Sequence, residues 1–296
     1  MSLIFDTHAH YDDEAFNEDR EAILSGLPAK GVGAVVNAVA SARTLPFILG
    51  LTDRYGYLYM TAGLHPCECY GCGDNMGSRV MIPEDMPEGH PAVMKAVSAF
   101  DGVQIIDETW TAGDREMKLL EAFMTEPRVV AVGEIGLDYH YDDTRKDVQQ
   151  KWFGDQIALA LRYGKPINVH SRDAAADTLD IIKAESARDV GGIIHCFSYG
   201  KEMAGEYLDM GFMLGIGGVV TFKNSRKIKE VVEYMPMDRI VLETDCPYLA
   251  PAPFRGQRND STLLTYAAQA IADIKGLPAE DVIAITQANA RRVYRV

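Results

Sequence analysis

The sequence contains no long run of apolar residues. A membrane-spanning helix needs roughly 18 or more apolar residues without charge, and no segment of the 296-residue chain approaches that length. Residues 1–6 carry neither the basic segment nor the apolar core of an export signal. We therefore expect a cytoplasmic protein that does not act at a membrane.

Cysteine and basic residues are also scarce. Five cysteines are an odd number in a long chain, which is typical of a reducing compartment rather than a disulfide framework. Lys and Arg number 29 against 43 Asp and Glu, so the formal net charge is -14. Broad attraction to duplex nucleic acid depends on a basic surface, and this charge argues against it. It does not exclude an enzyme that meets phosphate through bound metal ions.

What the sequence does contain is a repeated alternation of short apolar runs with longer helical patterns. Hydrophobic residues make up 47% and charged residues 24%, as in an ordinary soluble globular protein. Runs that are apolar at consecutive positions indicate strands buried on both faces, as in a parallel sheet covered by helices. The eight runs are residues 3–5, 32–39, 58–62, 129–132, 166–169, 192–194, 212–216 and 239–242.

Eight strands alternating with helices predict an α/β fold, a (β/α)8 TIM barrel, and such barrels often reach roughly 250 residues as one unit. We therefore expect a single domain over residues 1–296. One segment breaks the rhythm: residues 67 to about 113 are rich in Gly, Pro, Met and Cys and are predicted to be a rim insertion after the third strand. The helical patterns cover residues 143–163, 173–187, 224–234, 261–274 and 278–294.

Histidines and acidic residues come at the ends of five of these runs. His8 and His10 follow the first run, and residues two apart on an extended chain project to the same side, so both imidazoles can face one ion. A barrel builds its active site at the carboxyl ends of its strands. That rule adds four candidates from the later runs, Glu134, His170, His195 and Asp245.

Each of these residues has an ordinary structural explanation when taken alone, such as a hydrogen-bonded rim histidine or a turn before a proline. Together they would place four histidines and two carboxylates around one cavity. Burying such groups is costly unless a cation organises them. Nitrogen and oxygen ligands without thiolate suit one or two divalent ions such as Zn²⁺, Mn²⁺ or Mg²⁺. The pattern therefore predicts a metal centre.

The chain carries seven motifs, five of which contain these residues: His8-x-His10, Gly63-Leu64-His65-Pro66, Gly133-Glu134-Ile135-Gly136-Leu137-Asp138, Val169-His170-x-Arg172, His195-Cys196-Phe197-Ser198, Glu243-Thr244-Asp245-x-Pro247-Tyr248-Leu249 and Arg255-Gly256-x-Arg258-Asn259. In this order they resemble the TatD family of metal-dependent deoxyribonucleases, which lie within the wider amidohydrolase barrels. Apart from the insertion, the resemblance spans residues 4 to about 292.

The resemblance implies a centre with two divalent ions. In similar proteins the paired ions activate a water for attack on phosphorus and stabilise charge on the leaving oxygen. Asp245 would accept the proton of the attacking water, so Asp245 and Glu134 are the predicted catalytic residues. The predicted ligands are His8, His10 and Asp245 for the first ion, His170 and His195 for the second, and Glu134 as a bridge between both.

Two further residues, His65 and Arg255, are predicted to contact the substrate phosphate. The planar guanidinium of an arginine suits phosphate, although Arg255 can equally be a solvated loop residue. The sequence departs from the family in two places. The tail loop continues as Asn259-Asp260-Ser261, where the family commonly has Asn-Glu-Pro. The insertion after Pro66 borders the site and is long enough to reshape it.

Three functions are compatible with these features. The first is a deoxyribonuclease or phosphodiesterase acting on DNA ends, as the family name implies. The second is a hydrolase of a small ester, amide or lactone, because an activated water attacks carbonyls equally well. Phosphotriesterase-like relatives commonly bridge their metals with a modified lysine, whereas Glu134 stands at that position and favours the TatD family. The third, a metal-binding partner protein without catalysis, is disfavoured by the intact ligand set.

The insertion contains a cluster of three cysteines. Cys67, Cys69 and Cys72 include a Cys-x2-Cys pair, which is half of a common structural zinc site, and His90 could supply a fourth ligand. However, the second half-site is missing and His90 lies in a turn-like segment. We therefore favour a partly mobile lid over residues 67 to about 113, restricting access to short or flexible substrate ends.

Overall fold

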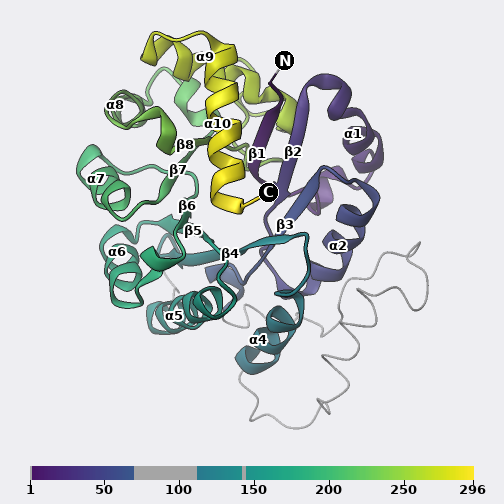
Figure 1. The fold of residues 1–296 in the computed structure, drawn as a ribbon, viewed down its shortest axis with the longest axis vertical. Coiled ribbons are helices and arrows are strands. Elements are labelled where there is room, and N and C mark those ends of the chain that lie inside the picture. The colour runs from purple at the N-terminus through teal and green to yellow at the C-terminus, as the bar shows by residue number, and fades with distance from the viewer. Residues whose placement is uncertain (1, 70–111, 142–144) are drawn as a thin grey trace. The chain divides into compact units, whose positions relative to one another are not determined.

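The computed structural model describes residues 2–69, 112–141 and 145–296. Its eight strands form one sheet in chain order, and the pairings β1–β2, β3–β4, β4–β5, β6–β7 and β7–β8 are parallel (Figure 1). A parallel bridge between Ala9 and Cys246 joins the first strand to the segment after the last. The strands are β1 (Ile4–Ala9), β2 (Val32–Asn37), β3 (Leu58–Ala62), β4 (Val129–Asp138), β5 (Ile167–Arg172), β6 (Gly192–Ile194), β7 (Met213–Ile216) and β8 (Ile240–Leu242).

Helices alternate with the strands, which confirms the predicted (β/α)8 TIM barrel. Two helices end at a glycine, because Gly164 and Gly276 adopt the left-handed conformation that stops a helix. The helices are α1 (Arg20–Gly26), α2 (Leu45–Arg54), α4 (Ala112–Phe123), α5 (Lys146–Tyr163), α6 (Ala175–Ala184), α7 (Lys201–Asp209), α8 (Arg226–Tyr234), α9 (Leu264–Lys275) and α10 (Ala279–Tyr294).

The described chain groups into two compact units. The first unit comprises Met1–Asn37, Tyr57–Tyr59 and Gly191–Val296, and the second comprises Ala38–Gly56 and Met60–Val190. Each unit contains several of the barrel strands and is described by itself below. The single domain over residues 1–296 stays a prediction.

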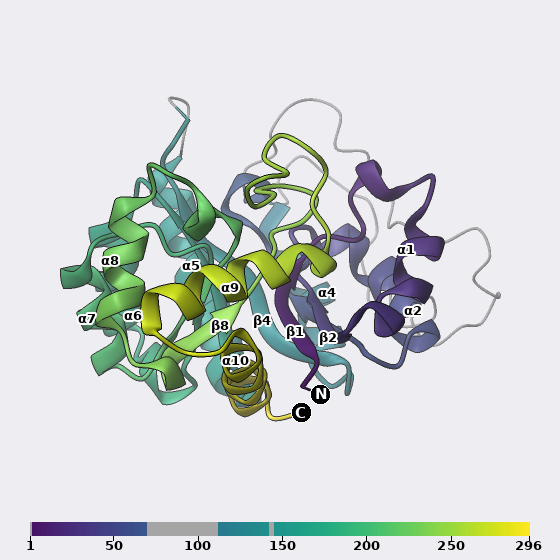
Figure 2. The same cartoon turned by 90° about the horizontal axis from the view of Figure 1, so that it is seen from above.

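In the first unit, the C-terminal helices are fastened to the strands by buried polar side chains. Figure 2 looks along α10 and shows α9 crossing beside it. The Tyr294 hydroxyl donates to the carbonyl of Thr7 in β1 at 3.0 Å. Asn289 donates to the carbonyls of Met237 and Ile240, both at 2.8 Å. Since buried amides are costly without partners, these contacts fix α10 against the base of β1 and β8.

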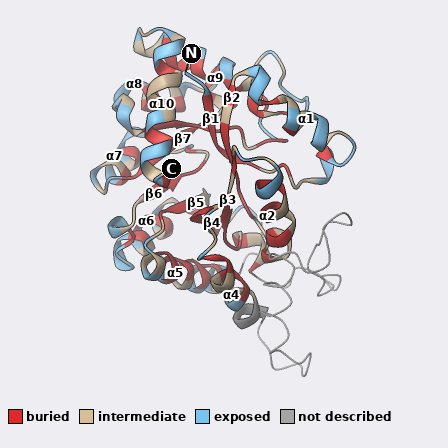
Figure 3. Ribbon diagram, turned by 45° about the vertical axis from the view of Figure 1, so that its right-hand side comes forward, coloured by how far each residue is buried: buried red, intermediate tan, exposed pale blue. Residues whose placement is uncertain are grey.

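In the second unit, the long helix α5 packs against β4, which is buried along its whole length (Figure 3). Gln149 accepts from the Asp138 backbone N–H at 2.8 Å and donates to the Asp138 carbonyl at 3.0 Å. Gln156 makes the same pair of contacts with the backbone of Leu64, at 2.7 and 3.2 Å. Two glutamines of one helix therefore hold the chain at the ends of β4 and β3, where candidate site residues lie.

The structure corrects several predicted element bounds. The third and sixth strands match the prediction, but the fourth continues beyond Val132 to Asp138, so Glu134 lies inside a strand and not after it. His8 and His170 likewise lie within β1 and β5. Gly133 and Gly136 interrupt the apolar run that predicted the strand. A Cβ at Gly136 would lie 1.9 Å from the His170 carbonyl oxygen, so glycine allows β5 to approach closely.

Four helices, α1, α2, α4 and α7, were not among the predicted segments. Most of the predicted insertion, residues 70–111, lies outside the described residues. Helix α4 begins at Ala112, close to the predicted end of the insertion. Among the described helices, none has the length and apolar character needed to cross a membrane.

Candidate metal centre

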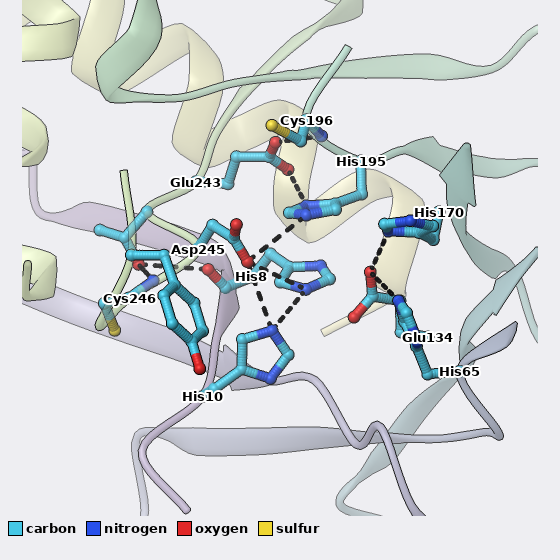
Figure 4. A network of polar contacts seen from close by, with 12 residues as sticks. His8, His10, His65, Glu134, His170, His195, Cys196, Glu243, Asp245 and Cys246 are labelled. Atoms are coloured by element: carbon cyan, nitrogen blue, oxygen red, sulfur yellow. Dashed lines mark hydrogen bonds and ion pairs between the residues drawn. The ribbon is translucent and has the colours of Figure 1, made fainter. Parts of the chain in front are cut away.

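Two histidines of β1 begin the first group of candidate ligands, in the first unit. His8 is buried within the strand and His10 follows its last residue. Their Nε2 atoms lie 3.2 Å apart (Figure 4). This agrees with the prediction that residues two apart project to the same side, and it brings two imidazole nitrogens to one point.

Asp245 joins these histidines from the turn after β8. Its Oδ1 lies 3.4 Å from His10 Nε2, 3.5 Å from His195 Nε2 and 4.0 Å from His8 Nε2. Its backbone adopts the left-handed conformation, with a φ of 58°, and its N–H donates to the His8 carbonyl at 2.9 Å. Burial opposes ionisation, but the contacts with His10 and His195 hold the pKa of Asp245 well below its usual range.

His195 completes this group from the end of β6. Its ring stacks on the His8 ring with centroids 3.4 Å apart. Its Nδ1 faces away from Asp245 and lies 3.2 Å from Oε2 of Glu243 (Figure 4). Burial disfavours the charged imidazolium, yet Glu243 and Asp245 raise the pKa of His195 well above its ordinary value. We call His8, His10, His195, Glu243 and Asp245 the His8 cluster.

A buried carboxyl group, Asp6, fixes the backbone beneath the His8 cluster. Its Oδ1 accepts from the backbone N–H groups of Thr244 at 3.0 Å and His8 at 3.2 Å. Its Oδ2 accepts from the hydroxyls of Thr244 and Ser261, both at 2.7 Å. Burial raises the pKa of Asp6 to about 7 despite these hydrogen bonds. The carboxyl group thus ties β1 to the segment that carries Asp245.

The second group lies in the second unit around His170. Oε1 of Glu134 lies 2.9 Å from His170 Nδ1 and 3.9 Å from His65 Nε2 (Figure 4). Oδ2 of Asp138 lies 3.0 Å from His170 Nε2. Burial of Asp138 opposes its ionisation, but His170 and the backbone of His140 lower the pKa of the Asp138 carboxyl. We call His65, Glu134, Asp138 and His170 the His170 cluster.

His65 belongs to this cluster and not to a separate surface. Its ring meets the His170 ring edge-on, with centroids 4.4 Å apart. Its Nδ1 accepts from the Cys67 backbone N–H at 3.1 Å, which leaves Nε2 directed at Glu134. The predicted contact of His65 with substrate phosphate stays a prediction, and the structure adds that its ring nitrogen is also a potential metal ligand.

Arg255 lies on the exposed loop after β8, in the first unit. Its guanidinium stacks over the Phe222 ring, 4.7 Å from the centroid. This contact holds the side chain against a neighbouring loop while leaving its N–H groups at the surface. Its role as a phosphate contact stays a prediction.

The cysteines of the predicted insertion are described only in part. Neither Cys67 nor Cys69 is in a disulfide, and Cys69 is buried with its Sγ 3.4 Å from the His65 carbonyl oxygen. Cys72 and His90 lie outside the described residues, so the zinc and lid hypotheses for this segment stay predictions.

The donor atoms of both clusters fit a divalent cation. Among the residues that the structure describes, three sets of side chains have ligand atoms within 4.8 Å of one another: His8, His10 and Asp245; His8, His195 and Glu243; and His65, Asp138 and His170. Each set contains only imidazole nitrogens and carboxylate oxygens, which suit Zn²⁺ and Mn²⁺ and, where carboxylates dominate, Mg²⁺. All six predicted ligands therefore lie in one cluster or the other.

Two residues of these clusters, Asp138 and Glu243, and the carboxyl group of Asp6, which fixes the backbone of the His8 cluster, were not predicted as site residues. Asp138 and Glu243 stand within the recognised motifs, but nothing in their spacing separates a ligand from a residue that contacts one. Asp6 precedes His8 by two positions in an apolar strand, and a buried carboxyl group there has no sequence signature apart from its charge.

Comparisons with known proteins agree with this donor set. The family model described as TatD related DNase matches residues 5–295. The uncharacterized metal-dependent hydrolase YabD of Bacillus subtilis is 37% identical over 294 residues, covering 99% of this chain and 100% of that protein. The uncharacterized metal-dependent hydrolase YcfH of Escherichia coli is 41% identical over 300 residues, covering 99% and 96%. The crystal structure of YjjV, a TatD homologue of Escherichia coli, superposes with a TM-score of 0.75 at 27% identity, covering 99% and 98%.

Proposed function

The chain belongs to the TatD-related DNase family, and from that membership we propose that this metal-dependent hydrolase cleaves phosphodiester bonds at the ends of DNA. The observation that carries the proposal is the His8 cluster, in which three imidazoles and Asp245 converge on one point. A family match over nearly the whole chain supports the assignment as a metal-dependent hydrolase. The family's name, and the ability of a metal site to stabilise negative charge, support phosphodiesters as the substrates.

We extend the proposal to two divalent ions, on the strength of the family motifs. Bound ions of this kind supply Lewis-acid stabilisation of negative charge and activate water. The chain's own groups orient the ions and accept protons. The proposed ligands are His8, His10 and Asp245 for the first ion, His170 and His195 for the second, and Glu134 for both.

Glu134 is the residue whose loss is expected to remove most metal. Its carboxylate contacts His170 at 2.9 Å and faces His65 at 3.9 Å, and a bridging role would make two ions depend on it. We expect Glu134→Ala to lower metal affinity by more than the roughly 10–100-fold typical of removing a group that only contacts a ligand. Metal content after dialysis, measured by plasma mass spectrometry, tests this.

The matched control is Glu185→Ala, which removes an exposed carboxylate at the end of α6 in the same unit. It should keep the parent's metal content. A Glu134→Ala protein with full metal content and full activity would contradict the two-ion proposal.

Asp245 is the proposed proton acceptor. Its contacts with His10 and His195 keep the carboxylate ionised, and an ionised oxygen at hydrogen-bond distance from an attacking water can take its proton. His65 and Arg255 are proposed to contact the substrate phosphate. For Arg255, the stack on Phe222 supports this role because it holds the guanidinium in place without using its N–H donors.

The substrate class is tested with one panel of compounds under identical metal loading. Single-stranded DNA, duplex DNA, RNA and a small phosphodiester are compared with a carboxylic ester, an amide and a lactone. We expect turnover on DNA ends and weaker or no turnover on the carbonyl compounds. Preference for a lactone, amide or ester would replace the nuclease proposal with a small-molecule hydrolase, and cleavage of none would leave only metal binding.

A further inference from the structure

Glu243 is a buried carboxylate directly behind one of the proposed metal ligands. It is 1% exposed, and it follows β8 two positions before Asp245. An ionised carboxylate at such a place is costly unless charged or N–H groups face its oxygens. The groups that face the Glu243 carboxylate therefore indicate its role.

Both oxygens of Glu243 face the same short segment of chain. Oε2 lies 3.2 Å from Nδ1 of His195. Oε1 accepts the backbone N–H of Cys196 at 2.5 Å. Cys196 has a φ of 45°, in the left-handed region, and this turn presents its N–H to the carboxylate. One carboxylate thus contacts the ring of His195 and the next peptide group.

The other ring nitrogen of His195 faces the proposed metal ligands. Nε2 lies 3.5 Å from Asp245 Oδ1, and the ring stacks on His8. A neutral imidazole has one N–H and one lone pair. If Nδ1 carries the proton and donates it to Glu243, the lone pair of Nε2 is directed toward Asp245 and is available to a cation.

A glycine in β7 provides the space for this carboxylate. A Cβ built on Gly215 would lie 2.0 Å from Glu243 Oε2 and 2.3 Å from its Cδ. Any larger residue would have to displace the carboxylate. The Glu243 carboxylate can therefore occupy this position only because residue 215 has no side chain.

The geometry points to Glu243 as the positioning residue of His195: its carboxylate lies 3.2 Å from Nδ1, where it is placed to accept Nδ1–H, fix the tautomer and ring orientation, and leave Nε2 to bind the ion. Carboxylates that receive the second N–H of a ligating histidine raise its basicity and are worth about 10–100-fold in metal affinity. This inference rests on the proposed metal site. The alternative role for Glu243 is direct ligation of the ion, because its carboxylate oxygens lie near the ring nitrogens of His8 and His195.

The first test replaces Glu243 with glutamine, which keeps the shape. An amide has one oxygen and one NH2 group, so it can accept from either His195 or Cys196 but must present a donor to the other. We expect Glu243→Gln to bind zinc about 10–100-fold more weakly than the parent, measured by competition with a chromophoric chelator. Glu230→Gln, the same change on the exposed side of α8 where Glu230 pairs with Arg226, should bind zinc like the parent.

The second test keeps the charge of Glu243 but shifts the position of its carboxylate. Gly215→Ala should displace the Glu243 carboxylate and weaken zinc binding as Glu243→Gln does. Gly26→Ala is the matched control, because a Cβ at Gly26 meets nothing within 4 Å. Circular dichroism checks that each variant is folded.

The deciding readout is the tautomer of His195 in the zinc-loaded protein, read from ¹⁵N shifts of the ring. We expect Nδ1–H with zinc on Nε2 in the parent, and a mixed or reversed pattern in Glu243→Gln. Zinc on Nδ1 in the parent, or a parent-like spectrum and affinity in Glu243→Gln, would overturn the inference. A parent that binds no zinc would instead refute the proposed metal site.

Discussion

Replacing Asp245 with asparagine is expected to lower kcat by about 100- to 10,000-fold, the usual contribution of a general base. Asparagine keeps an oxygen near the three imidazole nitrogens that lie 3.4 to 4.0 Å from Asp245 Oδ1. It has no charge and is a poor proton acceptor. Much of the metal should therefore remain at saturating ion concentration, while turnover is lost.

The measurement compares kcat, KM and ion content of Asp245→Asn with the parent under saturating Mn²⁺. The control is Asp209→Asn, which makes the same change at the exposed end of α7 and should leave all three unchanged. If Asp245→Asn cleaves at the parent rate, Asp245 is only a ligand or a turn residue. If it loses all metal, its main role is to bind the ion.

The fold could be predicted because the barrel strands are buried on both faces. Consecutive apolar residues such as those of β2 and β3 therefore mark strands directly. The same rule failed at β4, where Gly133 and Glu134 interrupt the apolar run inside a fully buried strand. The helical patterns in turn missed α1 and α7, which are short and have few buried residues.

The candidate ligands could be predicted because each is a histidine or a carboxylate that follows an apolar run, and both features are visible in the sequence. The residues that hold those ligands could not. Asp6 accepts a hydrogen bond from Thr244, 238 positions away. The Glu243 carboxylate occupies the space that a side chain at position 215 would fill. Such contacts depend on which backbones the fold brings together, and one sequence does not contain that information.

Removing bound metal is expected to lower hydrolysis by more than about 1,000-fold. Ions at these clusters would supply several kcal/mol of charge stabilisation in the transition state, and each 1.4 kcal/mol corresponds to a factor of ten in rate. Rebinding should also stabilise the fold, by about 2.7 kcal/mol when the free ion exceeds Kd 100-fold, because the folded state presents the assembled ligands. A higher Tm on adding Zn²⁺ or Mn²⁺ checks this without any substrate.

The most direct test of the account is to titrate Mg²⁺, Mn²⁺ or Zn²⁺ into chelator-treated, dialysed protein and follow nucleotide release from end-labelled DNA. The account predicts no release from the metal-free protein and a rate that rises with the ions bound per chain until the sites are full. Undiminished cleavage by the metal-free protein, or no cleavage by the fully loaded protein with any of these ions, would contradict it.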